Sequence, residues 1–336
     1  MKYFLAIFIA ALTLSACKSD KNIPDVSGIK VQLDVKRFDQ DLFTTDTNNI
    51  SASLNGLQEK YGSFLNDYLY NILMLPPVED TVVNKLKSFI RDYKPIYDSV
   101  QKTFPSFNDE QQEIAHALQF TKYYFPQYKE PKQIITFVGP LEGYGNVLTT
   151  SGFAVGLQLY LGKDFPIYHQ DYIVDVYPEY QSRKFAAPYI PVNCIHNVID
   201  DLFPPATGRQ TLIEQMIEEG KRLYVLDHLL PETADTLKTG YTASQLQGCY
   251  ENEAAIWNFF VQNNLLFITD PIQTRDYVND APTTQALGPA SPGNIGEFIG
   301  WQIVKKWMAN NEKITLTKLM QTPAKQIFEE AKYKPR

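Results

Sequence analysis

One histidine and two carboxylates on consecutive helical segments are the residues of this chain best suited to chemistry. His196 and Asp200 are four positions apart, so on a helix their side chains share one face. Glu219 follows on the next helical segment. A His/Asp pair on one helix with a carboxylate on the next is a donor set that Zn²⁺ accepts. These three residues are therefore the metal-site candidates.

The residue after this histidine argues against hydrolysis. In metallopeptidases with an H-E-x-x-H helix, the glutamate after the first histidine serves as the general base that activates water. Asn197 holds that position here, and its amide cannot take the proton. Asp200 replaces the second histidine with a shorter and harder donor. From the residues alone, we favour a polar structural cluster between two helices over a working zinc site.

Other catalytic motifs are missing from the sequence. It contains no G-x-S-x-G, no phosphate-binding glycine loop after a strand and no Cys-x-x-Cys pair. The glycine-rich residues 291–296 (SPGNIG) follow no expected strand. We interpret them as the entry turn of a helix in which Gly296 and Gly300 allow close packing.

The N-terminus has the pattern of a bacterial lipoprotein signal peptide. Residues 1–16 contain Lys2, an apolar run too short to span a bilayer, and small residues directly before Cys17 (LSAC). Cleavage there would leave Cys17 as the acylated first residue, and three acyl chains anchor a protein firmly. We therefore expect a membrane-anchored lipoprotein of the cell envelope. Lys18, rather than Asp, after the cysteine favours the outer membrane.

Composition narrows the class of protein further. The 336 residues are 44% hydrophobic, which is enough for a large packed core and excludes a disordered or collagen-like chain. The formal charge of −7 and the lack of a basic stripe argue against a nucleic-acid partner. Cys194 and Cys249 could form a disulfide in an oxidising envelope, but we favour two buried thiols because both lie in apolar helical patterns.

The periodicity of apolar residues predicts an α+β, mostly helical fold. After a tether at 17–27, residues 28–336 form one domain with a small central sheet and a helical C-terminal half. The expected strands are 31–35, 133–138 and 153–160, the last two joined as a pair by the turn at 143–146. The expected helices are 54–73, 82–100 with a kink at Pro95, 109–124 capped by Asn108, 191–203, 209–229, 243–264 and 293–311, with short ones after Thr315 and Thr322.

Several motifs together resemble the GldB family of gliding-motility lipoproteins, along essentially the whole chain. They are the LSAC signal, 134–139 (IITFVG), 159–164 (LYLGKD), 216–224 (MIEEGKRLY), 229–231 (LLP), 291–296 (SPGNIG) and 300–304 (GWQIV). The resemblance implies an envelope protein of gliding bacteria associated with the machinery that secretes motility adhesins. It also implies a zincin-like fold, a degenerate relative of metallopeptidases, in which His196 matches the first metal ligand and Glu219 the third. Asn197 and Asp200 depart from that pattern.

Two functions follow from these observations. The first is a non-catalytic scaffold of the gliding and secretion machinery, anchored to the membrane by Cys17, that binds a partner in a peptidase-like cleft and needs no cofactor. The alternative is a metal-dependent peptidase with the unusual ligands His196, Asp200 and Glu219. Under the scaffold hypothesis, the same three residues are the remnant of a zinc site.

Overall fold

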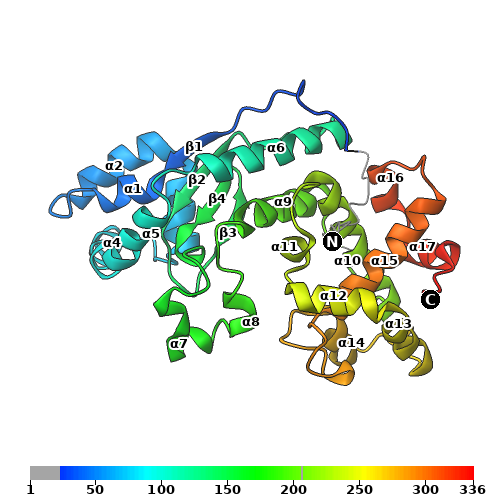
Figure 1. Cartoon of the computed structure of the whole chain (residues 1–336). Coiled ribbons are helices and arrows are strands. Elements are labelled where there is room, and N and C mark those ends of the chain that lie inside the picture. The colour runs from blue at the N-terminus through cyan, green and yellow to red at the C-terminus, as the bar shows by residue number, and fades with distance from the viewer. Residues whose placement is uncertain (1–22, 206) are drawn as a thin grey trace, which may run out of the picture.

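A four-stranded mixed sheet organises the N-terminal half of the molecule (Figure 1). The computed structural model describes residues 23–205 and 207–336, so the expected signal peptide at 1–16 and the lipidation site Cys17 lie outside the described residues. The strand order is β1-β2-β4-β3, with β1, β2 and β4 parallel and β3 antiparallel at one edge. The strands are β1 (Asp34–Arg37), β2 (Gln133–Phe137), β3 (Asn146–Thr149) and β4 (Gly152–Gly156).

The pairing of the two central strands differs from the sequence prediction. We expected the turn at 143–146 to join the second and third predicted strands directly, but β2 and β4 are parallel neighbours. The extra strand β3 begins at Asn146 and forms the hairpin with β4 instead, in the register Val147 opposite Ala154. A tight turn cannot join two parallel strands. The chain therefore runs back along β3 before it enters β4 in the same direction as β2. The predicted hairpin was wrong because β3 has only four residues, all half-buried, and so gives no clear apolar alternation in the sequence.

The helices of the N-terminal half cover the expected segments but are broken more often. Asn108, predicted to cap its helix, is instead the first helical residue, and no side chain caps that end. Gly62 has φ +57° and separates two helices where one was predicted over 54–73. The predicted helix at 82–100 is two helices, and Pro95 sits in the first turn of the second, where a missing N–H costs nothing. The helices are α1 (Phe38–Phe43), α2 (Ile50–Tyr61), α3 (Ser63–Asn66), a π-helical turn (Asp67–Ile72), α4 (Glu79–Asp92), α5 (Lys94–Thr103) and α6 (Asn108–Tyr124).

The C-terminal half is helical, as predicted, and the α+β, mostly helical, single-domain prediction is confirmed. The predicted helix at 243–264 is split at Asn252. The helices are α7 (Asp171–Val174), α8 (Glu179–Ser182), α9 (Tyr189–Leu202), α10 (Leu212–Leu229), α11 (Asp235–Thr239), α12 (Ala243–Glu251), α13 (Glu253–Gln262), α14 (Pro271–Val278), α15 (Ile295–Asn310), α16 (Leu316–Gln321) and α17 (Ala324–Ala331). Among the described residues, none of the helices is long and apolar enough to span a bilayer.

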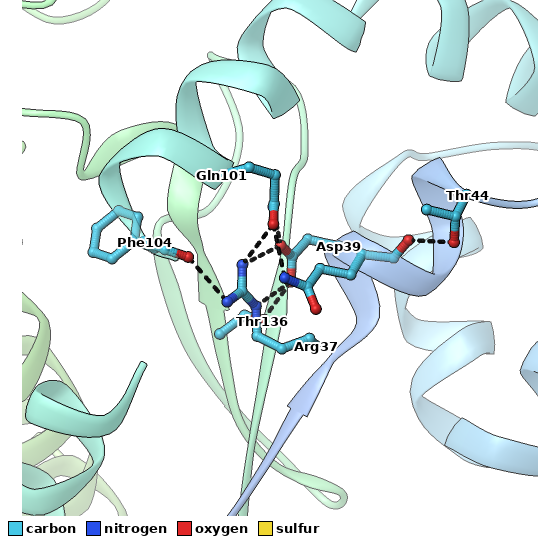
Figure 2. Close-up of polar contacts among 7 residues, drawn as sticks. Arg37, Asp39, Thr44, Gln101, Phe104 and Thr136 are labelled. Atoms are coloured by element: carbon cyan, nitrogen blue, oxygen red, sulfur yellow. Dashed lines mark hydrogen bonds and ion pairs between the residues drawn. The ribbon is translucent and has the colours of Figure 1, made fainter. Parts of the chain in front are cut away.

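A buried carboxylate connects the first strand to the rest of the sheet (Figure 2). Asp39 is fully buried and accepts hydrogen bonds from Arg37 at 2.8 Å and from the hydroxyl of Thr136 at 2.5 Å. Gln101 on α5 donates to the same carboxylate at 2.9 Å, and Arg37 also donates to the carbonyl of Phe104 at 3.0 Å. Because every partner is satisfied, the buried charge links β1, β2 and α5 without an unpaired group.

Aromatic side chains fill the core beside this network. Phe38 packs edge to face against Phe64 and Tyr68, and these two rings in turn contact Phe137 of β2, with ring centroids 4.6–6.3 Å apart across the cluster. The hydroxyl of Tyr68 donates to the carbonyl of Val138 at 2.8 Å, so the buried phenol is satisfied. Much of the chain's high aromatic content therefore stabilises the fold. The two thiols of Cys194 and Cys249 are free and buried, as favoured from the sequence.

Helices α10 and α15 cross with their backbones in near contact (Figure 1). A Cβ atom on Gly300 would lie 1.6 Å from the carbonyl oxygen of Met216, and one on Gly220 would lie 2.1 Å from the carbonyl carbon of Gly300. Gly296 is similarly crowded by Tyr277. The expectation that Gly296 and Gly300 allow close packing is confirmed, and Gly220 completes the contact from the opposing helix.

The glycine contact gives a prediction for stability. Gly300→Ala should lower the free energy of unfolding by about 3 kcal/mol or more, because the added methyl must force two helix backbones apart. Gly248→Ala on α12 is the matched control, since nothing lies within 4 Å of the position that its added methyl would take. That change should raise the free energy of unfolding by about 0.5–1 kcal/mol, because alanine favours a helix over glycine. Urea unfolding measures both, and a mild effect of Gly300→Ala would contradict the packing argument.

Candidate functional site

His196 on α9 lies where two adjoining cavities meet. The larger, which we call the tyrosine groove, has a volume of about 520 Å³ and is lined by Tyr144, Tyr160, Tyr177, Phe185 and Tyr189 among others. The smaller, which we call the acidic pocket after Asp280 and Glu297, has a volume of about 240 Å³. Asn294 also lines it, as do the cationic residues Arg183, Lys184 and Lys238. Lys184, Tyr189, Asn193, His196 and Asp280 line both cavities, so they form one cleft.

The residues that line this cleft come from two groups of elements. On one side are the segment with α7 and α8 and the edge strand β3; on the other are the loop after α11, the residues that follow α14 and the start of α15. Helix α9 runs beside β3 and carries His196, Asn193 and Asn197 to the junction. The cleft is therefore built from segments that are far apart in the sequence.

Asn197, at the position of a general base, is bonded to the edge strand. Its Nδ2 donates to Oδ1 of Asn146 on β3 at 2.7 Å. The Nδ2 of Asn146 donates in turn to the sulfur of Cys194 at 3.1 Å. Nearby, Asn193 donates to the hydroxyl of Tyr160 at 2.8 Å. These amides attach α9 to the sheet, and Asn197 has no group that could take a proton from water.

His196 itself sits in a desolvated position. Burial lowers the pKa of its imidazole below the ordinary value of 6.5; the nearby Asp200 opposes that shift and Arg222 adds to it. The ring is therefore neutral at pH 7. The described residues offer His196 no hydrogen bond, so its ring nitrogens remain open to a bound molecule.

Asp200 is neutralised by an arginine that the sequence analysis did not select. Arg222 on α10 donates to Oδ1 of Asp200 at 2.5 Å and to the carbonyl of Phe203 at 2.6 Å. Asp200 is exposed and lines a different cavity, together with β3. This ion pair links α9 to α10, and the cation beside Asp200 is the guanidinium of Arg222.

The three metal candidates do not gather around one point. Glu219 lines a third cavity, on the side of α10 that faces the residues after α9. Within residues 23–205 and 207–336, no group of three or more His, Cys, Asp or Glu side chains is arranged to hold a metal ion. His196, Asp200 and Glu219 therefore do not form such a group in the described structure. As the sequence predicted, His196 and Asp200 lie on one helix, α9, and Glu219 lies on the next long helix, α10.

A partly buried carboxylate beside the helix crossing, Glu297, was not among the residues selected from the sequence. Burial raises the pKa of Glu297 to about 8, and the charges of Glu219 and Asp280 add to the shift, whereas Lys184 opposes it. Burial likewise raises the pKa of Glu219 above its ordinary value. Glu297 is half-buried in the first turn of α15 and accepts a hydrogen bond from Asn294 at 3.2 Å. The spacing N-x-x-E at a helix start was the available signal.

Comparison with known proteins yielded one match. A family model described as gliding motility protein GldB matches residues 19–335. A search of curated proteins and a search of solved structures each found no match.

The raised pKa of Glu297 predicts a stabilising substitution. Its folded-state pKa of about 8 exceeds the ordinary 4.5, so between these values the unfolded chain releases a proton that the folded chain keeps. The free energy of unfolding therefore falls through this group as the pH rises from 4.5 to 8. Glu297→Gln removes that loss, so its Tm should exceed that of the native chain by an amount that grows from pH 5 to pH 8.

Thermal unfolding at several pH values measures this difference. Glu329→Gln on the exposed face of α17 is the control, because it removes a solvent-exposed carboxylate that does not line the cleft. A gain for Glu297→Gln that does not change with pH would contradict the buried-carboxylate argument.

Proposed function

Because this chain belongs to the GldB family of gliding motility proteins, we propose that it binds a partner protein of the gliding machinery in the cleft around His196, without catalysing a reaction. Anchoring to the envelope membrane through Cys17, in the outer membrane, is part of this proposal and rests on the sequence pattern of residues 1–17. The partners we expect are other proteins of the gliding and secretion machinery.

One observation carries the proposal: the position that would activate water holds Asn197, and its amide is already bonded to β3. A peptidase needs a base within reach of its water, with a pKa suited to taking its proton. The neutral amide pair Asn146–Asn197 offers hydrogen-bonding groups and no base. The surroundings of His196 therefore favour holding a polypeptide over cleaving one.

The tyrosine groove has features that are typical of a polypeptide-binding site. Strand β3 pairs with β4 on one side only, and an edge strand has backbone N–H and C=O groups available to an added strand. The groove adjoins the start of that strand at Asn146. Tyrosine side chains supply contact area and hydroxyl groups at low entropic cost, which is why interfaces are rich in them. Tyr144 is 56% exposed at the rim and is available to a partner.

We also propose that the fold is a degenerate relative of the zincins. The support is the order of parts: an antiparallel edge strand, then the helix with His196, then the helix with Glu219. In this chain the glycine after Glu219 serves the contact between α10 and α15. Arg222 neutralises Asp200 where the family pattern would use a metal ligand.

The alternative, a metal-dependent peptidase, has weaker support, and its test is the metal content. The purified mature lipoprotein should contain less than about a tenth of an equivalent of zinc, where a structural or catalytic site holds one. Elemental analysis after dialysis against zinc measures it. A full equivalent that His196→Ala removes, and that Glu329→Gln leaves in place, would favour the peptidase.

A substitution at the groove rim tests the proposed function directly. Tyr144→Ala should weaken partner binding by about tenfold, because truncating a tyrosine that a partner covers typically costs about 1–2 kcal/mol. Its effect on the free energy of unfolding should stay within about 0.5 kcal/mol, since the side chain is mostly exposed. The measurements are recovery of envelope proteins cross-linked to the lipidated protein and colony spreading of the strain with this allele.

The matched control is Tyr123→Ala on α6, which removes a similarly exposed tyrosine remote from the groove lining. It should leave both readouts unchanged, whereas deletion of the gene should abolish spreading. Normal spreading of the deletion strain, or equal effects of the two tyrosine substitutions, would contradict the proposal.

A further inference from the structure

The acidic pocket adjoins the tyrosine groove and has its own chemistry. We infer that it holds one cationic side chain, an arginine or lysine of the segment bound in the groove. This inference deepens the proposed function and rests on it for the source of the cation. Four features of the pocket support it: its size, an unpaired acceptor, a carboxylate without a cation, and lining cations that already have partners.

The size and position of the pocket suit a single side chain. Its volume is about 240 Å³, less than half that of the groove, and His196 and Asn193 stand at the junction of the two cavities. A polypeptide lying in the groove could therefore extend one side chain past His196 into the pocket. The inner end is formed by Gly240 after α11 and by Asn294 and Glu297 at the start of α15.

Asn294 presents an acceptor that lacks a donor. Its Oδ1 is buried, and no described residue donates a hydrogen bond to it. Its Nδ2 is directed to Glu297, and its backbone carbonyl accepts from Tyr241 at 2.8 Å, so the side chain is held in place. The residue has φ +53°, a conformation that costs free energy for a non-glycine residue. A buried acceptor held in this way calls for a donor from a bound molecule.

Glu297 lacks a cation of its own. Within the described residues no Lys, Arg or His nitrogen lies within 4 Å of its carboxylate, and Lys184 acts on it only at longer range. Glu219 and Asp280 bring further negative charge toward it. The carboxylate therefore gains most from a cation that enters from outside, which would also restore its ionised form.

The positive residues of the pocket already have partners. Lys184 pairs with Asp280 at 2.8 Å. Lys238 pairs with Asp227 and with Asp235, and Arg183 donates to the carbonyl of Gly240 at 2.8 Å. An anion would have to break these contacts, whereas a guanidinium or ammonium group would meet the free acceptors of Asn294 and Glu297. Such a group carries three to five donors and no acceptor, which matches them.

The test compares cationic and neutral probes on the mature lipidated protein in nonionic detergent. The probes are n-butylguanidinium, n-butanol, and the peptides acetyl-Ala-Thr-Arg-Thr-Ala-amide and its norleucine counterpart, with dissociation constants from ligand-observed NMR. The arginine peptide should bind about tenfold more tightly than the norleucine peptide, as expected for charge-assisted hydrogen bonds. The free guanidinium should bind weakly and compete with it, and n-butanol should not.

Variants assign the effect to the pocket. Glu297→Gln should reduce the preference for arginine about tenfold, and this variant is expected to be the more stable protein, so unfolding cannot explain the loss. Asn294→Gly keeps the positive φ, removes the amide and should reduce the preference as well. Glu329→Gln, a carboxylate removed far from the pocket, should leave it intact. Equal binding of the two peptides, or a preference that survives Glu297→Gln, would overturn the inference.

Failure of this inference is separable from failure of the proposed function. If partner recovery depends on Tyr144 while arginine and norleucine peptides bind alike, the groove binds a partner and the pocket does not select a cation. If the free guanidinium binds in a Glu297-dependent way while neither peptide does, the pocket takes its cation from a small molecule. That result would overturn the inference that the cation belongs to a bound polypeptide.

Discussion

The near contact of α10 and α15 is the constraint on which the rest of the site depends. Two helix backbones approach this closely only where neither has a Cβ, and Gly220 and Gly300 meet at that point. The same approach brings Glu219 on one helix toward Glu297 on the other. Burial raises both pKa values, and the charge of Glu219 adds to the shift at Glu297. The helix crossing thus stabilises the C-terminal half and creates the acidic end of the cleft, at a cost in electrostatic free energy that falls when a proton or a cation is bound.

Two interactions on α9 account for the chemical character of the cleft. Asn197 bonds to Asn146 and ties the helix to the edge strand, and Arg222 pairs with Asp200 and ties it to α10. Both use side chains that a zinc peptidase would need for a base or a ligand. In this chain, Asn197 and Asp200 instead hold α9 against β3 and α10. What remains around the cleft is a neutral imidazole, several tyrosines and a buried amide oxygen of Asn294 to which no described residue donates.

The sequence predicted the elements more accurately than their connections. Apolar periodicity located α9, α10 and α15 to within three residues, because each has a continuous buried face. It failed at β3, a four-residue strand with no fully buried position, and so the parallel pairing of β2 with β4 was mistaken for a hairpin. It also joined helices that Gly62 and Asn252 separate, since one residue with a changed backbone interrupts a helix without altering the apolar period.

By itself the sequence determined the class of the fold, the helix that carries His196, the amide residue Asn197 beside it and the family, because residue identity and local spacing encode these properties. The proposal that Cys17 is lipidated likewise rests on the sequence pattern alone. Only the tertiary structure decided what each candidate meets: Asp200 meets Arg222, Glu219 lies near Glu297, and His196 faces a cleft lined from three separate segments. Charge pairing and desolvation act through space, between residues whose distance along the chain says nothing about their distance in the fold.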